Sequence, residues 1–122
     1  AEAYLNAAEA EMHISGESSA KAKGYIDALR NRAHAAVRAS YTLNDVLDER
    51  SRELYCEGLR RTDLIRFNQF GGSQATYNWE LKGGNANGTT FDKKFNVYPI
   101  PSSEILANKN LTQIDGYNEV EN

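Results

Sequence analysis

The sequence predicts a mainly α-helical protein, in which a helical hairpin and further helices precede an irregular, loop-rich C-terminal segment with short strands. Two features lead to this prediction. Apolar residues recur at intervals of three and four through residues 1–70, the spacing of one face of a helix. From residue 71 onward glycine and asparagine become frequent, and the helical spacing ends. We expect residues 1–122 to form a single domain, helical over 1–70, with residues 71–122 wrapping over the helices.

Two Ala-rich helices are predicted first, over residues 1–15 and 19–38. The first carries two apolar stripes, so we expect it to pack on two sides. The second carries one stripe, formed by Ala22, Ile26, Leu29, Ala33 and Ala36. Such a pair is a tetratricopeptide-like helical hairpin, a repeat unit that needs neighbours to bury its faces. Because the chain also opens at Ala1 within a helical pattern, we expect it to be part of a longer protein.

The third predicted helix has the clearest start. Thr42 is followed three residues later by Asp45, which is a capping-box pattern. We expect a helix from Leu43 to about Glu57. Thr62 is then predicted to cap a short helix from Asp63 to about Asn68.

Charged residues interrupt the apolar stripe of this third helix. Arg50 and Glu57 share the side of the helix that otherwise carries leucine and valine, and Arg60 and Asp63 follow just beyond it. Buried charges are stable only when they are paired. We therefore predict a structural ion network formed by Arg50, Glu57, Arg60 and Asp63, with some of these side chains buried.

Carboxylates spaced four residues apart raise the question of catalysis. Asp45 and Glu49 share one face of the third helix, as do Glu53 and Glu57. Two carboxyl groups are what glycoside hydrolysis needs. Here the many neighbouring arginines would hold the carboxylates ionised, which is the wrong state for a general acid. We predict no catalytic residue, and a protein that is not an enzyme.

The Gly-rich region contains the two candidate carbohydrate-binding residues, Tyr77 and Trp79. With Leu81 they alternate as in a half-buried strand, whose other face would carry Asn78, Glu80 and Lys82. An aromatic ring can cover the C–H groups of a sugar while nearby amides bind its hydroxyl groups. The alternative, which we favour, is that Trp79 packs on the helices and anchors the loop. Further along, one short helical turn is predicted over residues 102–107.

Composition excludes several other classes of function. The net charge of −3 and the absence of a basic stripe argue against a nucleic-acid partner. One cysteine, Cys56, rules out an internal disulfide. The only histidines, His13 and His34, lie on different predicted helices, so we expect no metal centre and no cofactor. A calcium site of scattered loop oxygens stays open at this point. We expect no membrane contact from this chain itself, since no stretch of it is long and apolar enough to span a bilayer.

Three segments together resemble a known family. They are Glu49–Phe67, Tyr77–Gly84 and Tyr98–Ile105, the last followed by Asn108–Gln113. This set is similar to the C-terminal part of the SusD/RagB family of Bacteroidetes outer-membrane lipoproteins, and residues 1–10 resemble the last tetratricopeptide-like helix of that family. The Arg-Arg-Thr sequence at residues 60–62 resembles the starch-binding branch, which also carries the Tyr-x-Trp and Lys-Gly-Gly sequences.

The resemblance implies a non-enzymatic protein that binds starch or another oligosaccharide at the cell surface. Family members are lipid-anchored in the outer membrane and deliver glycans to a SusC-like TonB-dependent transporter in polysaccharide utilisation. Their sugar contacts lie mostly upstream of the matched region, so the resemblance assigns none to this chain. The alternative is a tetratricopeptide-type scaffold for protein–protein interaction.

Overall fold

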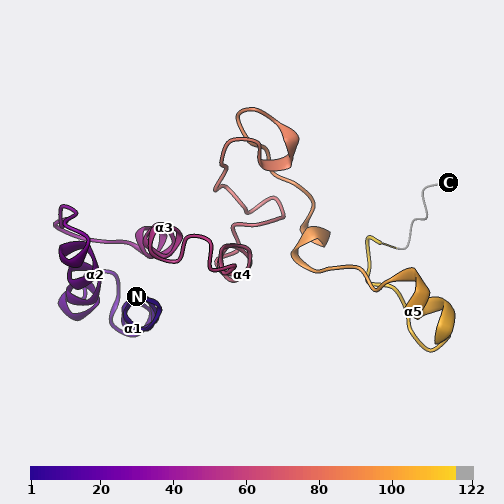
Figure 1. Cartoon of the computed structure of the whole chain (residues 1–122), viewed down its shortest axis with the longest axis horizontal. Coiled ribbons are helices and arrows are strands. Elements are labelled where there is room, and N and C mark those ends of the chain that lie inside the picture. Colours follow the sequence, from indigo (N-terminus) through magenta and orange to yellow (C-terminus); the bar gives the residue numbers. More distant parts are fainter. Residues whose placement is uncertain (118–122) are drawn as a thin grey trace. The chain divides into compact units, whose positions relative to one another are not determined.

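The computed structural model describes residues 1–117, which contain five α-helices and two short 3₁₀ helices (Figure 1). The chain divides into an N-terminal unit, Ala1–Asp63, and a C-terminal unit that begins at Leu64. The mainly helical class predicted from the sequence is confirmed. The single domain over residues 1–122, with residues 71–122 wrapped over the helices, stays a prediction.

The N-terminal unit is built on three helices, α1 (Glu2–Ser15), α2 (Ala20–Arg32) and α3 (Leu43–Glu53). Helix α1 packs against both α2 and α3, as its two apolar stripes predict. The core consists of Leu5, Ala8, Met12, Ala22, Ile26, Leu29, Tyr41 and Val46. The capping box at the start of α3 is present in full, because the side chains of Thr42 and Asp45 each accept from the other residue's backbone N–H.

Helix α2 ends earlier than its apolar spacing predicts. His34 adopts a left-handed conformation with φ 54°. Its N–H donates to Asn31 O at 3.1 Å, and the N–H of Ala35 donates to Arg30 O at 2.8 Å. These two bonds form a Schellman motif, which satisfies the last carbonyl groups and stops the helix. Residues 33–38 of the predicted helix therefore lie outside α2.

The predicted ends of the next two helices are also corrected. Helix α3 stops at Glu53, and Cys56 lies beyond it with φ 64°. Helix α4 (Arg60–Arg66) begins before Thr62, so Thr62 is inside the helix and does not cap it. Its hydroxyl donates instead to Leu59 O at 2.8 Å. Helix α4 ends, like α2, in a Schellman arrangement, here with Asn68 at φ 56°.

The described part of the C-terminal unit contains no β-strand, so the predicted short strands are wrong. Residues 75–79 carry no helix or turn but have no ladder partner, and the Tyr77 N–H donates to the Gln69 side chain at 2.8 Å. The regular elements beyond α4 are η1 (Lys82–Gly84), η2 (Lys93–Asn96) and α5 (Ser102–Ala107), the last as predicted.

In this unit, side-chain amides form the hydrogen bonds with backbone groups that a neighbouring strand would form in a sheet. The Gln113 amide accepts from the Ile100 N–H and donates to the Ile100 carbonyl, both at 2.9 Å. The Asn96 amide brackets the backbone of Gly71 in the same manner. These paired bonds reproduce the pattern that a neighbouring strand would supply. None of the helices over residues 1–117 has the length and hydropathy that crossing a bilayer requires.

Candidate functional site

The loop of residues 69–91 carries both candidate carbohydrate-binding residues. Trp79 keeps 36% of its surface exposed, and Tyr77 is half-buried. The other large apolar side chain of the segment, Leu81, is 71% exposed. An aromatic ring that is partly open to solvent, on a loop with Asn78, is chemically able to stack on a sugar. A role of either aromatic residue in sugar binding stays a prediction.

Lys82 is the buried centre of this loop. Its exposed fraction is 1%, and its ammonium donates to the carbonyl of Tyr77 at 2.8 Å and to that of Gln69 at 3.3 Å. The ammonium also lies over two aromatic rings, 4.9 Å from the centroid of Trp79 and 5.3 Å from that of Phe91. These distances are those of cation–π contacts. Burial lowers the pKa of the Lys82 ammonium below its ordinary value.

The position of Lys82 inverts the predicted alternation. In the predicted strand, Leu81 and Trp79 share the buried face and Lys82 lies on the exposed face. In the structure the lysine is buried and the leucine is exposed. The cause is the backbone, because Leu81 takes a left-handed conformation with φ 65° and opens the turn of η1. Sequence reasoning missed Lys82, since lysine is almost never fully buried.

Glycine closes the loop on the other side. Gly88 has φ 71°, and a Cβ atom there would collide with the carbonyl of Trp79. The N–H of Thr89 then donates to Lys82 O at 2.9 Å. Phe91 stacks edge-on against Phe70, with 4.9 Å between the ring centroids. Residues 79 and 89, which precede and follow Lys82 in the loop, are thereby held close to the lysine backbone.

The predicted ion network is only partly brought together. Arg50 and Asp63, each with a side chain 4% exposed, form an ion pair at 2.8 Å, and Arg50 also donates to Asn6 Oδ1 at 2.7 Å. Arg60 donates to the carbonyl of Leu47 at 2.9 Å. Glu57 is exposed, because α3 ends before it and no longer turns it toward the core.

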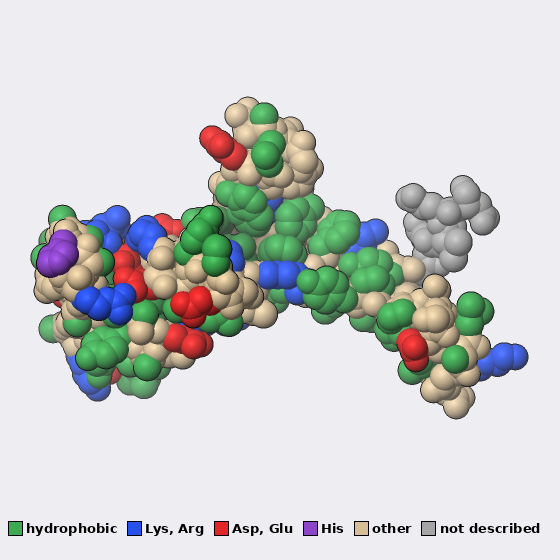
Figure 2. Space-filling model, viewed as in Figure 1, with side chains coloured by type: hydrophobic (Ala, Val, Ile, Leu, Met, Phe, Trp, Pro, Cys, Tyr) green, Lys and Arg blue, Asp and Glu red, His purple; other side chains and the backbone are tan. Residues whose placement is uncertain are grey.

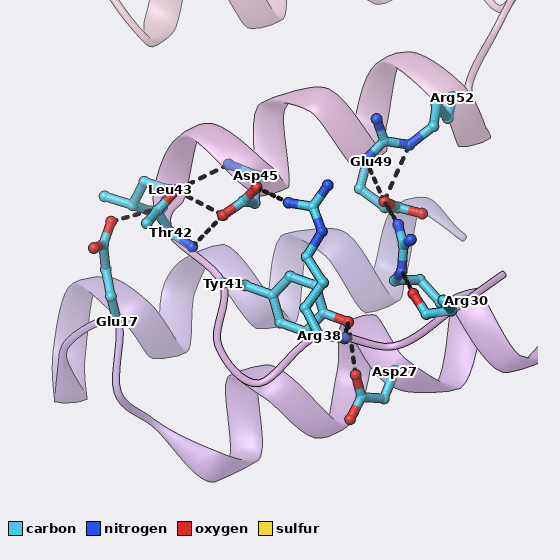
Figure 3. A network of polar contacts seen from close by, with 11 residues as sticks. Glu17, Asp27, Arg30, Arg38, Tyr41, Thr42, Leu43, Asp45, Glu49 and Arg52 are labelled. Carbon is cyan, nitrogen blue, oxygen red and sulfur yellow. Dashed lines mark hydrogen bonds and ion pairs between the residues drawn. The ribbon is translucent and has the colours of Figure 1, made fainter.

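A second polar network links α2 and α3 (Figure 3). Arg30 and Arg52 both point to Glu49, with Arg30 at 2.8 Å from its carboxylate. Arg38 pairs with Asp45 in the same view. No local spacing indicated the pairs Arg38–Asp45 and Arg30–Glu49, whose partners are 7 and 19 residues apart in the chain, whereas Arg52 and Glu49 are three residues apart on α3.

Two carboxyl groups near this network, those of Asp45 and Asp27, have lowered pKa values. Burial alone would raise the pKa of Asp45, but hydrogen bonds from Thr42 and the charge of Arg38 outweigh burial and hold the pKa below its ordinary value. The pKa of Asp27 is likewise lowered, since Lys23 and the Tyr41 hydroxyl outweigh its burial. Glu53 pairs with Arg32. The lowered pKa values of Asp27 and Asp45 suit these two side chains to ion pairing.

The rest of the described surface offers little other chemistry. A cleft of about 390 Å³ lies beside the Arg50–Asp63 pair and is also lined by Tyr55, Cys56 and Arg61. Within residues 1–117 no three His, Cys, Asp or Glu side chains are grouped to hold a metal ion. Acidic and basic side chains are interspersed over the N-terminal unit on the face shown in Figure 2.

Known proteins are similar to this chain in both sequence and structure. The pattern of the SusD family matches residues 1–117. The chain is 43% identical, over 118 residues, to the starch-binding protein SusD of Bacteroides thetaiotaomicron, and this match covers 96% of the chain and 20% of that protein. Among solved structures, surface glycan-binding protein A from Bacteroides uniformis aligns with a TM-score of 0.72 and 30% identity, covering 92% of this chain and 25% of the other. The chain thus spans about a fifth to a quarter of the length of these relatives.

Proposed function

We propose that this chain, which belongs to the SusD family, is the C-terminal part of a protein that binds oligosaccharides at the cell surface without cleaving them. The observation that carries the proposal is the 43% identity to a starch-binding protein across 96% of the chain. The structural similarity to a surface glycan-binding protein supports the same function from an independent comparison.

Starch-type glucans are the proposed ligand class. The match to the starch-binding relative extends over 118 residues, 96% of the chain, and so is not confined to the helices. Within this chain Tyr77 and Trp79 are the proposed contacts, because their loop presents a partly open indole ring beside an amide side chain. Most sugar contacts of the longer protein are proposed to lie outside this chain.

The proposed partner and location follow from the family. We place the protein at the outer membrane, held by a lipid anchor outside this chain and paired with a SusC-like TonB-dependent transporter. The structural relative is a surface glycan-binding protein, which supports the proposed location. Affinity purification of the tagged longer protein from detergent-solubilised membranes should recover such a transporter, and its absence after cross-linking would contradict the pairing.

Affinity electrophoresis tests the binding function. The 122-residue chain and the longer protein that contains it are run in native gels with and without soluble starch, beside a protein that does not bind starch. We expect retardation of the longer protein in starch. Migration that starch, xylan and laminarin all leave unchanged would contradict glycan binding. If no glycan changes the migration and affinity purification recovers a protein other than a SusC-like transporter, the tetratricopeptide-type scaffold becomes the better interpretation.

A further inference from the structure

We propose that Lys82 is a positioning residue for the glycan-contacting face of the loop, and that it acts by holding the Trp79 ring from its buried side. This inference rests on the proposed glycan function. It assigns a role to a residue that would not itself touch the ligand. We call the exposed face of Tyr77 and Trp79 on the loop of residues 69–91 the platform. In this proposal the buried Lys82 ammonium fixes the orientation of its indole ring.

The geometry of the ammonium is the first argument. A lysine ammonium has three donors and no acceptor, and here two donors are directed at the carbonyls of Tyr77 and Gln69. The ring of Trp79, at 4.9 Å, and that of Phe91, at 5.3 Å, face the same nitrogen. Within residues 1–117 no carboxylate forms an ion pair with Lys82. The cation is therefore stabilised by carbonyl groups and aromatic faces together.

The second argument is that Lys82 contacts both candidate residues. It binds Tyr77 through the backbone carbonyl and Trp79 through the ring, and its own N–H donates to Trp79 O at 3.1 Å. A carbonyl acceptor fixes the backbone, but only the ring contact restrains the indole itself. Because Trp79 stays 36% exposed, burial alone does not hold its orientation. A ring that is already fixed loses less conformational entropy when a ligand stacks on it.

Trp79 is the only tryptophan in the chain, so intrinsic fluorescence reports on this ring alone. The experiment compares the unchanged chain with Lys82→Met, which keeps the length of the side chain and removes its charge. Lys93→Met is the matched control, because Lys93 is an exposed lysine of the same unit. Acrylamide quenching, near-ultraviolet dichroism and a pH titration of the fluorescence are recorded for each protein.

We expect Lys82→Met to increase acrylamide quenching and to weaken the tryptophan dichroism, while Lys93→Met changes neither. In the unchanged chain the fluorescence should show a reversible transition as Lys82 deprotonates, at a pH below the ordinary lysine value, with helical dichroism intact. Lys93→Met should keep this transition and Lys82→Met should lose it. The titration of the unchanged protein needs no substitution, and the absence of any such transition there would overturn the inference even if Lys82→Met fails to fold. A transition that Lys82→Met retains would overturn the inference.

Binding separates this inference from the proposed function. In starch gels of the longer protein, Trp79→Ala and Lys82→Met should both reduce retardation, and Lys93→Met should not. If Trp79→Ala leaves retardation unchanged, the platform is not a glycan contact and the inference fails with it, although glycan binding elsewhere stands. If Trp79→Ala abolishes retardation but Lys82→Met retains it fully, the platform stands and the positioning role is wrong.

Discussion

Replacing Asp63 by alanine should destabilise the N-terminal unit by about 3–5 kcal/mol, because the Arg50 guanidinium would remain buried without its carboxylate. Both side chains are 4% exposed and their ion pair measures 2.8 Å, so little water can replace the lost partner. The remaining bond from Arg50 to Asn6 is to a neutral oxygen and cannot balance the charge. With about 4–8 °C of melting temperature per kcal/mol for a unit of this size, the midpoint should fall by more than about 12 °C.

Urea unfolding followed by far-ultraviolet dichroism measures this effect. Glu57→Ala is the matched control, because Glu57 is exposed, and it should change the free energy of unfolding by less than about 0.5 kcal/mol. The double variant Arg50→Met/Asp63→Leu removes both charges and should recover much of the loss. If Asp63→Ala unfolds at the same urea concentration as Glu57→Ala, the burial and pairing of Asp63 are refuted.

Three further predictions concern the cap, the pH dependence and catalysis. Thr42→Ala removes the side-chain cap of α3 and should cost about 1 kcal/mol in the same urea assay; an unchanged midpoint would contradict the capping box. Asp27 and Asp45 have folded-state pKa values below their unfolded values, so the stability that they contribute is complete above about pH 4 and is lost as the pH falls through the folded values. Melting temperatures between pH 7 and pH 3 should show this fall, and Asp27→Asn should reduce it. Finally, incubation with α- and β-linked oligosaccharides should release no reducing sugar, and release that Glu53→Gln abolishes would show a catalytic carboxylate.

The helical part of the fold could be predicted because its signals are local. The start of α3 follows from Thr42 and Asp45, whose hydrogen bonds close within one turn. The ends were harder, since His34 and Cys56 take left-handed conformations for which glycine is the usual signal. The burial of Arg50 followed from its place on an apolar stripe, whereas the exposure of Glu57 depends on where α3 stops.

The loop could not be predicted to the same extent, because its structure depends on contacts without a local pattern. The Lys82 ammonium binds carbonyl groups 5 and 13 residues away in the chain. From the sequence alone, Lys82 is predicted to be an exposed polar side chain. The predicted strand failed because the left-handed Leu81 breaks the alternation that begins at Tyr77. The predicted packing of Trp79 on the helices stays a prediction, and the largest fully buried side chain of this segment is that of Lys82.

Isothermal titration calorimetry of the longer protein with maltoheptaose tests the central claim, glycan binding, most directly. We predict a saturable heat of binding for this α-1,4-linked glucan and none for cellohexaose, which has the same monosaccharide in β-1,4 linkage. Trp79→Ala should weaken the maltoheptaose isotherm, while Lys93→Met leaves it unchanged. A longer protein that is folded and gives no heat with maltoheptaose or with any other oligosaccharide of a representative panel would contradict the account.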